Sequence, residues 1–304
     1  MSLMDEIKNY YKTGDTLRRL IFINIAVFLL VHLVALVFFL FNLETGPYNP
    51  IVKWLSLPAY LGDLIIRPWT FISYMFLHEG IFHILFNMLW LFWFGRIFLT
   101  SFRQKQLLSV YLLGGLAGGA LYIAAYNIFP AFDQHKMGAL ALGASAAVMA
   151  IVVAISAYKP NYSINLLLIG PVRIKYIAIV VVILDVVSIR MGNAGGHIAH
   201  LGGALFGYWF AERYRSQRDI TKGFNRLLDR IFAFFTWKSG MRVTHKKTTY
   251  RWRNARKMDD FEYNRRKADD QQRVDEILDK ISKKGYASLT KEEKEFLFRQ
   301  RDNY

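Results

Sequence analysis

Apolar residues gather in six long runs, and stretches rich in polar residues, glycine or proline separate these runs. A helix needs about 20 predominantly apolar residues to cross the hydrocarbon core of a bilayer. The pattern therefore predicts six membrane-spanning helices, over residues 20–41, 76–99, 107–129, 137–158, 174–189 and 198–212.

The connections between these runs differ in character. Residues 42–75 contain four prolines together with apolar patches such as Trp54-Leu55, so we expect part of this loop to lie in the membrane interface. Residues 164–169 form a short apolar arm that ends at Gly170-Pro171. The third run carries Gly114-Gly115 and Gly118-Gly119, small residues that allow helices in a membrane to approach closely.

Composition supports a polytopic membrane protein over two soluble domains, which the length of 304 residues alone would allow. Hydrophobic residues make up 54% of the chain and aromatic residues 16%. The absence of cysteine excludes disulfides, a cysteine nucleophile and a cysteine-ligated zinc site. The first apolar run is too long for a signal peptide, and no small-residue cleavage pattern follows it.

The net charge of +16 is unevenly distributed. From Arg213 to Tyr304 there are 25 Lys and Arg against 14 Asp and Glu, so +11 lies in the tail. Basic residues also flank alternate ends of the apolar runs, at Arg18-Arg19, Arg96 and Lys159. Because cytosolic loops carry the excess of Lys and Arg, both termini are predicted to be cytosolic.

The tail has its own pattern. Apolar residues recur at helical spacing between Phe224 and Phe235, against Arg226 and Arg230, which predicts an amphipathic helix in the membrane surface. Short helices are predicted over 275–283 and 291–299, with a capping box between Thr290 and Glu293 before the second. The predicted divisions are a cytosolic segment 1–19, a six-helix membrane domain 20–213, an interfacial helix 214–241, a charged linker 242–270 and a small helical cytosolic module 271–304.

Three reactive side chains share one predicted depth in the membrane. Ser145 lies fourteen residues before Lys159, and His83 and His200 each lie thirteen residues before the basic residue that ends their helix. At 1.5 Å per residue, each is roughly 20 Å from the cytosolic boundary. This depth falls in the outer half of the membrane, and it indicates a common site.

Ser145 and His200 are the candidate nucleophile and base. A serine within a span often bonds only to its own helix, but Gly143 marks a point where the helix could begin, which would leave N–H groups free to stabilise an oxyanion. An ionisable residue inside a span is by default a functional hypothesis. Gly203 and Gly207 lie on the His200 face, so they would let a neighbouring helix approach and bring His200 to the serine.

His83 and Asn87 are candidate oxyanion donors. They are four residues apart and therefore lie on one face of the second helix. Both can donate hydrogen bonds to a tetrahedral intermediate. The alternative is that they only hydrogen-bond between helices.

A metal site is the main chemical rival. His78 and His83 are five apart, which differs from the zincin spacing, whereas His197 and His200 could ligate a metal. Asp185 lies near the outer end of its helix, where capping, ion pairing or folding is the expected role, and it is not included in the catalytic set. No metal and no cofactor are therefore predicted.

Taken together, these residues resemble the rhomboid intramembrane serine proteases. The resemblance covers about residues 18–213 and rests on the runs 68–78 and 83–87, on Gly143-Ala144-Ser145, and on Ala199-His200 with Gly203 and Gly207. It implies a six-helix bundle that opens outward and cleaves membrane-anchored proteins in or near their transmembrane helices. Ser145 and His200 would form a dyad without a third member, and His83 and Asn87 would stabilise the oxyanion. The family usually has glycine after the serine, where this chain has Ala146.

The expected partners are transmembrane protein substrates and membrane lipids. The basic tail favours anionic lipid or a protein partner, and nucleic acid is not expected. The expected location is a bacterial inner membrane. Two alternatives are an inactive rhomboid-like protein that binds or escorts membrane-protein clients, and a solute transporter, which an internal repeat would favour. No such repeat is visible in the sequence.

Overall fold

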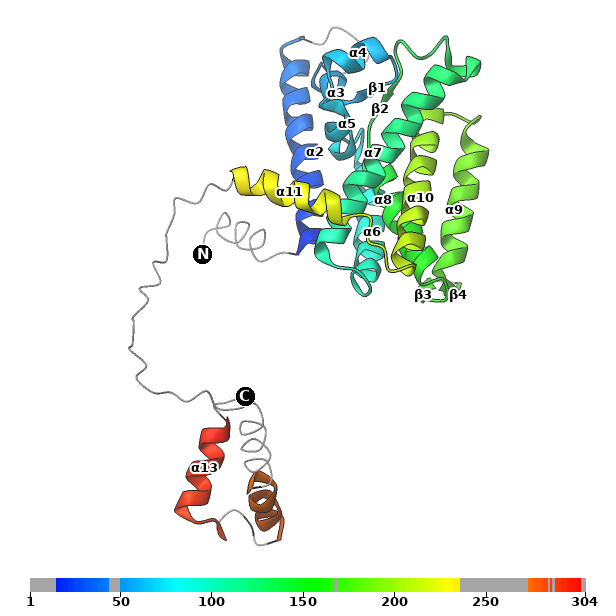
Figure 1. Cartoon of the computed structure of the whole chain (residues 1–304). Coiled ribbons are helices and arrows are strands. Elements are labelled where there is room, and N and C mark those ends of the chain that lie inside the picture. The colour runs from blue at the N-terminus through cyan, green and yellow to red at the C-terminus, as the bar shows by residue number, and fades with distance from the viewer. Residues whose placement is uncertain are drawn as a thin grey trace. The chain divides into compact units, whose positions relative to one another are not determined.

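The structure, a computed structural model, describes residues 15–43, 50–166, 169–235, 273–283, 285 and 288–301. The chain forms two separate units, Met1–Trp237 and Lys238–Tyr304. In the described part of the first unit, six helices pack side by side into a bundle (Figure 1). These are α2 (Thr16–Leu40), α6 (Ile81–Leu99), α7 (Gln104–Ile128), α8 (Ser145–Tyr158), α9 (Ile174–Ser188) and α10 (Ala194–Arg215).

Three of these helices are long and apolar enough to cross a membrane, namely Thr16–Leu40, Ile81–Leu99 and Gln104–Ile128. Ser145–Tyr158 is a shorter apolar helix. The apolar surface of α2 points largely outward, and Leu29, Leu33 and Phe39 are each more than 60% exposed. Side chains of this kind are stable in lipid and costly in water, so the bundle is that of a membrane protein.

Helix α8 occupies the centre of the bundle, in contact with α6, α7, α9 and α10. Ten of its fourteen residues are buried, and most of these are alanine, valine or isoleucine. A helix that is apolar on all sides is suited to burial on all sides. Four neighbouring helices therefore surround the element that begins with Ser145.

Two predicted helix starts were wrong. The second helix begins at Ile81, because Gly80 has an extended backbone, with φ −152°, directly before it. The fourth begins at Ser145 instead of residue 137, because Gly143 has φ +127°, a conformation that only glycine adopts readily. The break lies at the point where Gly143 had indicated an alternative start.

The 42–75 connection is partly helical in its described part. Arg67 is 6% exposed, bonds Asp63 Oδ2 at 2.6 Å and lies over the Trp54 ring. Trp54 also stacks on Trp69, with ring centroids 6.0 Å apart. The elements here are α3 (Pro50–Leu55), β1 (Leu57–Pro58), α4 (Leu61–Ile66), α5 (Thr70–Ser73) and the 3₁₀ turn η1 (Tyr74–Phe76).

The prediction of helices alone missed two small antiparallel pairs. Strand β1 pairs with β2 (Leu140–Ala141). Strand β2 follows the 3₁₀ turn η2 (Pro130–Phe132) and comes just before α8. The predicted apolar arm is a hairpin of β3 (Ser163–Leu166) and β4 (Gly170–Arg173). Gly170 has φ +85°, which allows the chain to turn back before Pro171.

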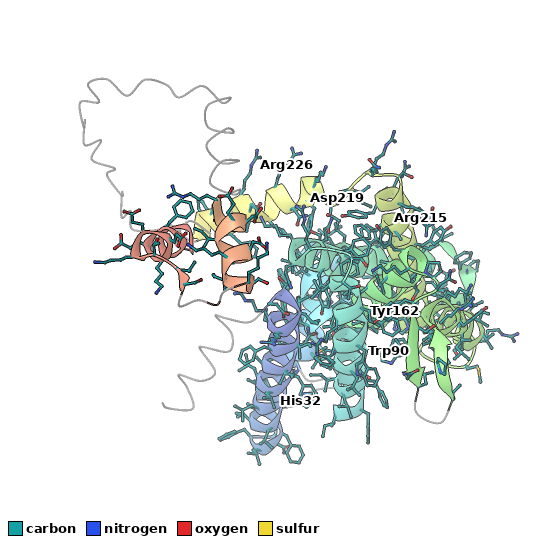
Figure 2. All side chains as sticks on the ribbon, turned by 90° about the horizontal axis from the view of Figure 1, so that it is seen from below. His32, Trp90, Tyr162, Arg215, Asp219 and Arg226 are labelled. Atoms are coloured by element: carbon teal, nitrogen blue, oxygen red, sulfur yellow. The ribbon has the colours of Figure 1, made fainter. Side chains whose placement is uncertain are left out.

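Helix α11 (Lys222–Phe235) follows α10, so residues 214–215 belong to α10 and not to the amphipathic helix predicted over 214–241. Polar pairs hold it and the preceding turn to the start of α7: Lys105 with Asp229 at 2.7 Å, Ser109 with Asn225 at 2.7 Å and Gln106 with Asp219 at 2.8 Å. The apolar side chains Leu227, Ile231 and Phe234 are exposed. Figure 2 labels Arg215, Asp219 and Arg226 along this stretch.

In the second unit, residues 273–283 are helical and α13 spans Lys291–Arg301. The capping box before α13 is formed as predicted, because Thr290 N–H donates to Glu293 Oε2 at 2.7 Å and Glu293 N–H to Thr290 Oγ1 at 3.3 Å. The Lys280 amine lies 2.7 Å from Glu293 Oε1 and lowers the pKa of that carboxyl. The predicted linker 242–270 lies outside the described residues.

Candidate active site

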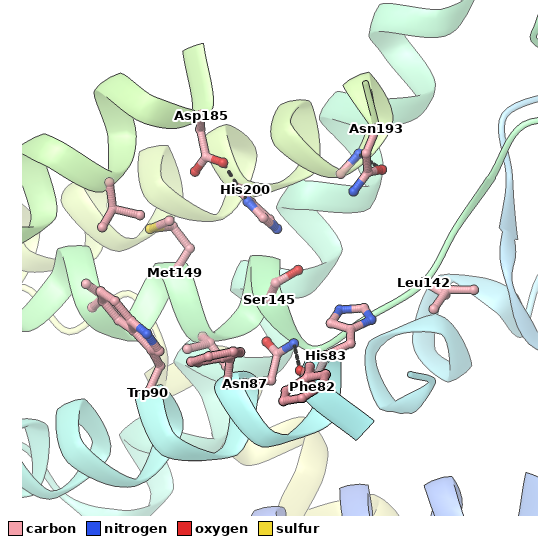
Figure 3. Close-up of a pocket in the computed structure, with 15 residues that line it drawn as sticks. Phe82, His83, Asn87, Trp90, Leu142, Ser145, Met149, Asp185, Asn193 and His200 are labelled. Atoms are coloured by element: carbon pink, nitrogen blue, oxygen red, sulfur yellow. Dashed lines mark hydrogen bonds and ion pairs between the residues drawn. The ribbon is translucent and has the colours of Figure 1, made fainter. Parts of the chain in front are cut away.

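A cavity of about 460 Å³ opens between α6, α8, α9 and α10 (Figure 3). Its wall contains Ser145 from α8, His200 from α10, and His83 and Asn87 from α6. The structure thus brings together the four side chains proposed for catalysis from the sequence. Most of the remaining lining is apolar: Phe82, Phe86, Trp90, Leu142, Val148, Met149, Val152 and Val181.

Ser145 is the first residue of α8. Gly143 fixes the approach to this helix, because its N–H donates to Tyr74 O at 2.9 Å. A Cβ at Gly143 would lie 3.0 Å from His83 Nε2 and 3.5 Å from Ser145 Oγ. The first N–H groups of a helix have no partner within it. The Ser145 hydroxyl and a set of free backbone donors therefore share one end of α8.

His200 is held by a carboxylate. Its Nδ1 lies 2.8 Å from Asp185 Oδ1, and Figure 3 shows the ring between Asp185 and Ser145. A hydrogen bond from Nδ1–H leaves Nε2 as the basic nitrogen of the neutral ring. Among the described residues, the hydrogen bond that His200 makes goes to Asp185, and none joins it to Ser145. Such contacts are often long before substrate binds.

The sequence does not predict Asp185 as a catalytic residue, whereas the structure puts it against the candidate base. It lies three residues before the end of α9, and α10 returns antiparallel after a short turn. His197, three residues into α10, is therefore at the level of Asp185, and His200 follows one turn later. Asp185 and His197 are each three residues from the end of their helix at the α9–α10 turn, and this equal spacing was the sequence signal that could have predicted the contact.

Asp185 also bonds His197, whose Nδ1 lies 2.8 Å from the same Oδ1. The carboxylate is 5% exposed, and its other oxygen, Oδ2, is buried without a hydrogen-bond partner in the described structure. One ligand atom from each of Asp185, His197 and His200 lies within 4.8 Å of the others. These three residues could therefore hold a metal ion.

The two oxyanion candidates differ in their present contacts. Asn87 donates from Nδ2 to His83 O at 2.9 Å, one turn back on its own helix. The His83 ring lies against Gly143 and edge-on to the His78 ring, with centroids 5.1 Å apart. The His83 side chain is thus directed toward the start of α8, whereas the Asn87 amide uses one of its two N–H groups within its own helix.

Glycines bring α10 onto α8. A Cβ at Gly203 would lie 2.0 Å from Ala146 O, and one at Gly207 would lie 2.2 Å from Ala150 O. The spacing between Ser145 and His200 is thus set by backbone in direct contact. On the α7 side, a Cβ at Gly118 would lie 2.6 Å from the Ala146 Cβ. Gly118 therefore leaves room for the methyl of Ala146.

Gly203→Ala is expected to destabilise the bundle by about 1–3 kcal/mol, the usual effect of overpacking a tight core. The added methyl meets a main-chain oxygen, which cannot move without shifting α8. Thermal unfolding in detergent measures the effect. Gly138→Ala is the matched control, because no atom lies within 4 Å of a Cβ there. Equal melting temperatures for both variants would contradict the close contact.

Comparison with known proteins agrees with this architecture. Residues 67–217 match the family model described as Rhomboid domain. The chain belongs to the rhomboid family. Residues 258–299 match a second model, described only as a family of unknown function (DUF6576).

Three curated relatives illustrate the family. RHOMBOID-like protein 12, mitochondrial, of Arabidopsis thaliana is 33% identical over 45% of this chain and 44% of its own length. Presenilin-associated rhomboid-like protein A, mitochondrial, of Danio rerio is 28% identical over 53% and 38%. Rhomboid protease GlpG of Haemophilus influenzae is 32% identical over 29% and 45%. The matched part spans less than half the length of each relative.

Proposed function

We propose that this rhomboid is an intramembrane serine endopeptidase in which Ser145 is the nucleophile and His200 the general base. The observation that carries the proposal is the single cavity that both side chains line, from two helices in direct contact. A serine is activated by a base within reach, and an imidazole is the usual base. Membership of a family that includes a named protease agrees with this function.

The chemistry follows from the orientation of the His200 ring. With Nδ1–H donated to Asp185, Nε2 is the nitrogen that can take the Ser145 proton as the hydroxyl attacks a peptide carbonyl. The protonated ring then gives this proton to the leaving amine, and water releases the acyl group from Ser145. Asp185 orients the ring and stabilises its positive charge, so it acts as a positioning residue.

The oxyanion would be bound at the start of α8. The Ser145 N–H, the His83 ring and the Asn87 amide are the proposed donors, and the second N–H of the Asn87 amide can bind the substrate while the first stays bonded to His83 O. Donors directed to a developing negative charge are often the largest single contribution to catalysis.

In the proposed membrane placement, all six predicted apolar segments cross the bilayer, with both termini on the cytosolic side. At 1.5 Å per residue, the fourteen residues of α8 extend about 21 Å, which is shorter than the ~30 Å hydrocarbon core. If Lys159 lies at the cytosolic surface, Ser145 is inside the membrane and the cavity opens toward the outer side.

The exposed apolar side chains of α11 then lie in the cytosolic interface. A bacterial inner membrane stays our proposed location, although two of the three relatives named above are mitochondrial.

The proposed substrates are transmembrane proteins. Within lipid a helix satisfies its own backbone hydrogen bonds, so a substrate helix must unwind locally before a carbonyl reaches Ser145. Segments with small residues and weak helical propensity are the expected sites. In this scheme the basic tail contacts anionic lipid or a protein partner. Catalysis needs neither metal nor cofactor.

Fluorophosphonate labelling of the detergent-solubilised protein tests the proposal. An activated serine reacts covalently with the probe, so wild type and Ser156→Ala should be labelled, whereas Ser145→Ala and His200→Ala should not. Ser156 is the matched control because it is a buried serine on the same helix. A folded wild type that stays unlabelled would favour the alternative, a rhomboid-like protein that binds or escorts clients. The lack of a Ser145–His200 hydrogen bond among the described contacts would then explain why the serine is not activated.

A further inference from the structure

We infer that Asp185, His197 and His200 form an inhibitory site for a divalent cation of the zinc type. The three residues lie at one level of the α9–α10 pair, and two imidazoles converge on one carboxylate oxygen, each at 2.8 Å. Two histidines and a carboxylate are a common set of three protein ligands for zinc, with a fourth position left for water. The cavity reaches both Asp185 and His200, which gives an ion a way in.

A second observation points to a missing ligand. Asp185 is 5% exposed, and its Oδ2 is buried with no hydrogen-bond partner in the described structure. Buried polar atoms normally have a partner, and a cation held by both oxygens of the Asp185 carboxylate would supply one. This orphaned oxygen distinguishes the cluster from two histidines that merely share an acceptor.

The distances fit a small ion. Zinc binds nitrogen and oxygen ligands at about 2.0–2.2 Å in a tetrahedron, so its ligand atoms are about 3.3 Å apart. The Nδ1–Oδ1 pairs at 2.8 Å would widen by about half an ångström to admit the ion. Both histidines are about one-fifth exposed, so their rings have room to make this adjustment.

Binding would switch off the base by moving one proton. In the metal-free protein His200 carries its proton on Nδ1 and keeps Nε2 free. An ion on Nδ1 takes the lone pair of that nitrogen, so the single proton of the neutral ring moves to Nε2, the nitrogen that faces Ser145. Nothing is oxidised or lost, but the ring can no longer accept the serine proton. The inhibition rests on the proposed function, whereas the binding does not.

Cobalt absorption tests the binding independently of catalysis. Co²⁺ bound in a tetrahedral site has strong visible absorption, so it is titrated into the Ser145→Ala protein, purified without a histidine tag. The band should appear in this background, persist with His135→Gln added and disappear with His197→Gln added, and Zn²⁺ should displace it. His135 is the matched control because it is an exposed histidine outside the cluster. No band, or a band that His197→Gln leaves unchanged, overturns the site.

Probe labelling then tests the inhibition, with each rate expressed relative to the same variant in EDTA. Zinc should slow the wild type and His135→Gln at least tenfold. His197→Gln should be at least tenfold less sensitive to zinc, because second-shell changes alone cost about 10- to 100-fold in metal affinity. Unchanged or faster labelling with zinc overturns the inhibitory role. A cobalt band in a protein that never reacts with the probe would leave the metal site standing and refute the proposed protease together with its inhibition.

Discussion

Ser145→Ala and His200→Ala are each expected to lower kcat for a transmembrane substrate by about 10⁴-fold or more, and the double variant should lose no more than either alone. Residues that act as one unit show this non-additivity. In the structure both side chains line the same cavity, from two helices in direct contact. The measurement is cleavage of a reconstituted single-span substrate in liposomes, followed over hours.

Two controls make this result specific. Ser156→Ala removes a buried hydroxyl from the same helix, and His135→Gln removes an exposed imidazole. Both should keep the wild-type rate. Losses that multiply in the double variant would show that the serine and the histidine act separately, and the dyad would have to be abandoned.

Asp185→Asn is expected to lower kcat by about 10²-fold while changing KM little. The amide no longer stabilises the protonated ring, and its NH₂ group can turn His200 into the wrong tautomer, an effect that reaches about 10⁴ in triads with this geometry. Because His200 still has Ser145 beside it, part of the activity should remain. The rate and the KM are measured with the same reconstituted substrate.

The split between kcat and KM separates positioning from folding. Asp185→Glu keeps the charge and should recover part of the rate, whereas Asp133→Asn removes a carboxylate from the α7–β2 connection and should have no effect. A variant that melts earlier but keeps its kcat would assign Asp185 to stability alone. Equal losses for Asp185→Asn and Asp185→Glu would also argue against orientation of the ring.

The helical bundle was predictable because its signal is local. Long apolar runs located α2, α7, α9 and α10 within a few residues, whereas α6 and α8 begin later than predicted, at Ile81 and Ser145. The errors arose where apolar sequence continues without being helical, as before Ile81 and in β3 and β4. Hydropathy records burial in lipid or protein, and it does not record the backbone conformation of the buried residue.

Two residues of the candidate site, Ser145 and His200, could be proposed from the sequence, whereas Asp185 could not. Ser145 and His200 are conspicuous as reactive groups in apolar runs, so their types and depth were enough to propose them. The Asp185 contact depends on how α9 and α10 are paired across a short turn, and that is a tertiary property. The depth of His200 was predicted by counting residues from the basic end of its helix. The level of Asp185 follows only from counting residues from the other end, at the turn between α9 and α10.

The glycine contacts between α8 and α10 have a consequence for sequence divergence. Gly203 and Gly207 face the carbonyl oxygens of Ala146 and Ala150, so main chain sets the distance between the two reactive side chains. Every residue type supplies the same carbonyl. The geometry of the reaction centre can therefore be inherited while the lipid-facing surface drifts, as expected for a chain that is 28–33% identical to its relatives over the matched segments.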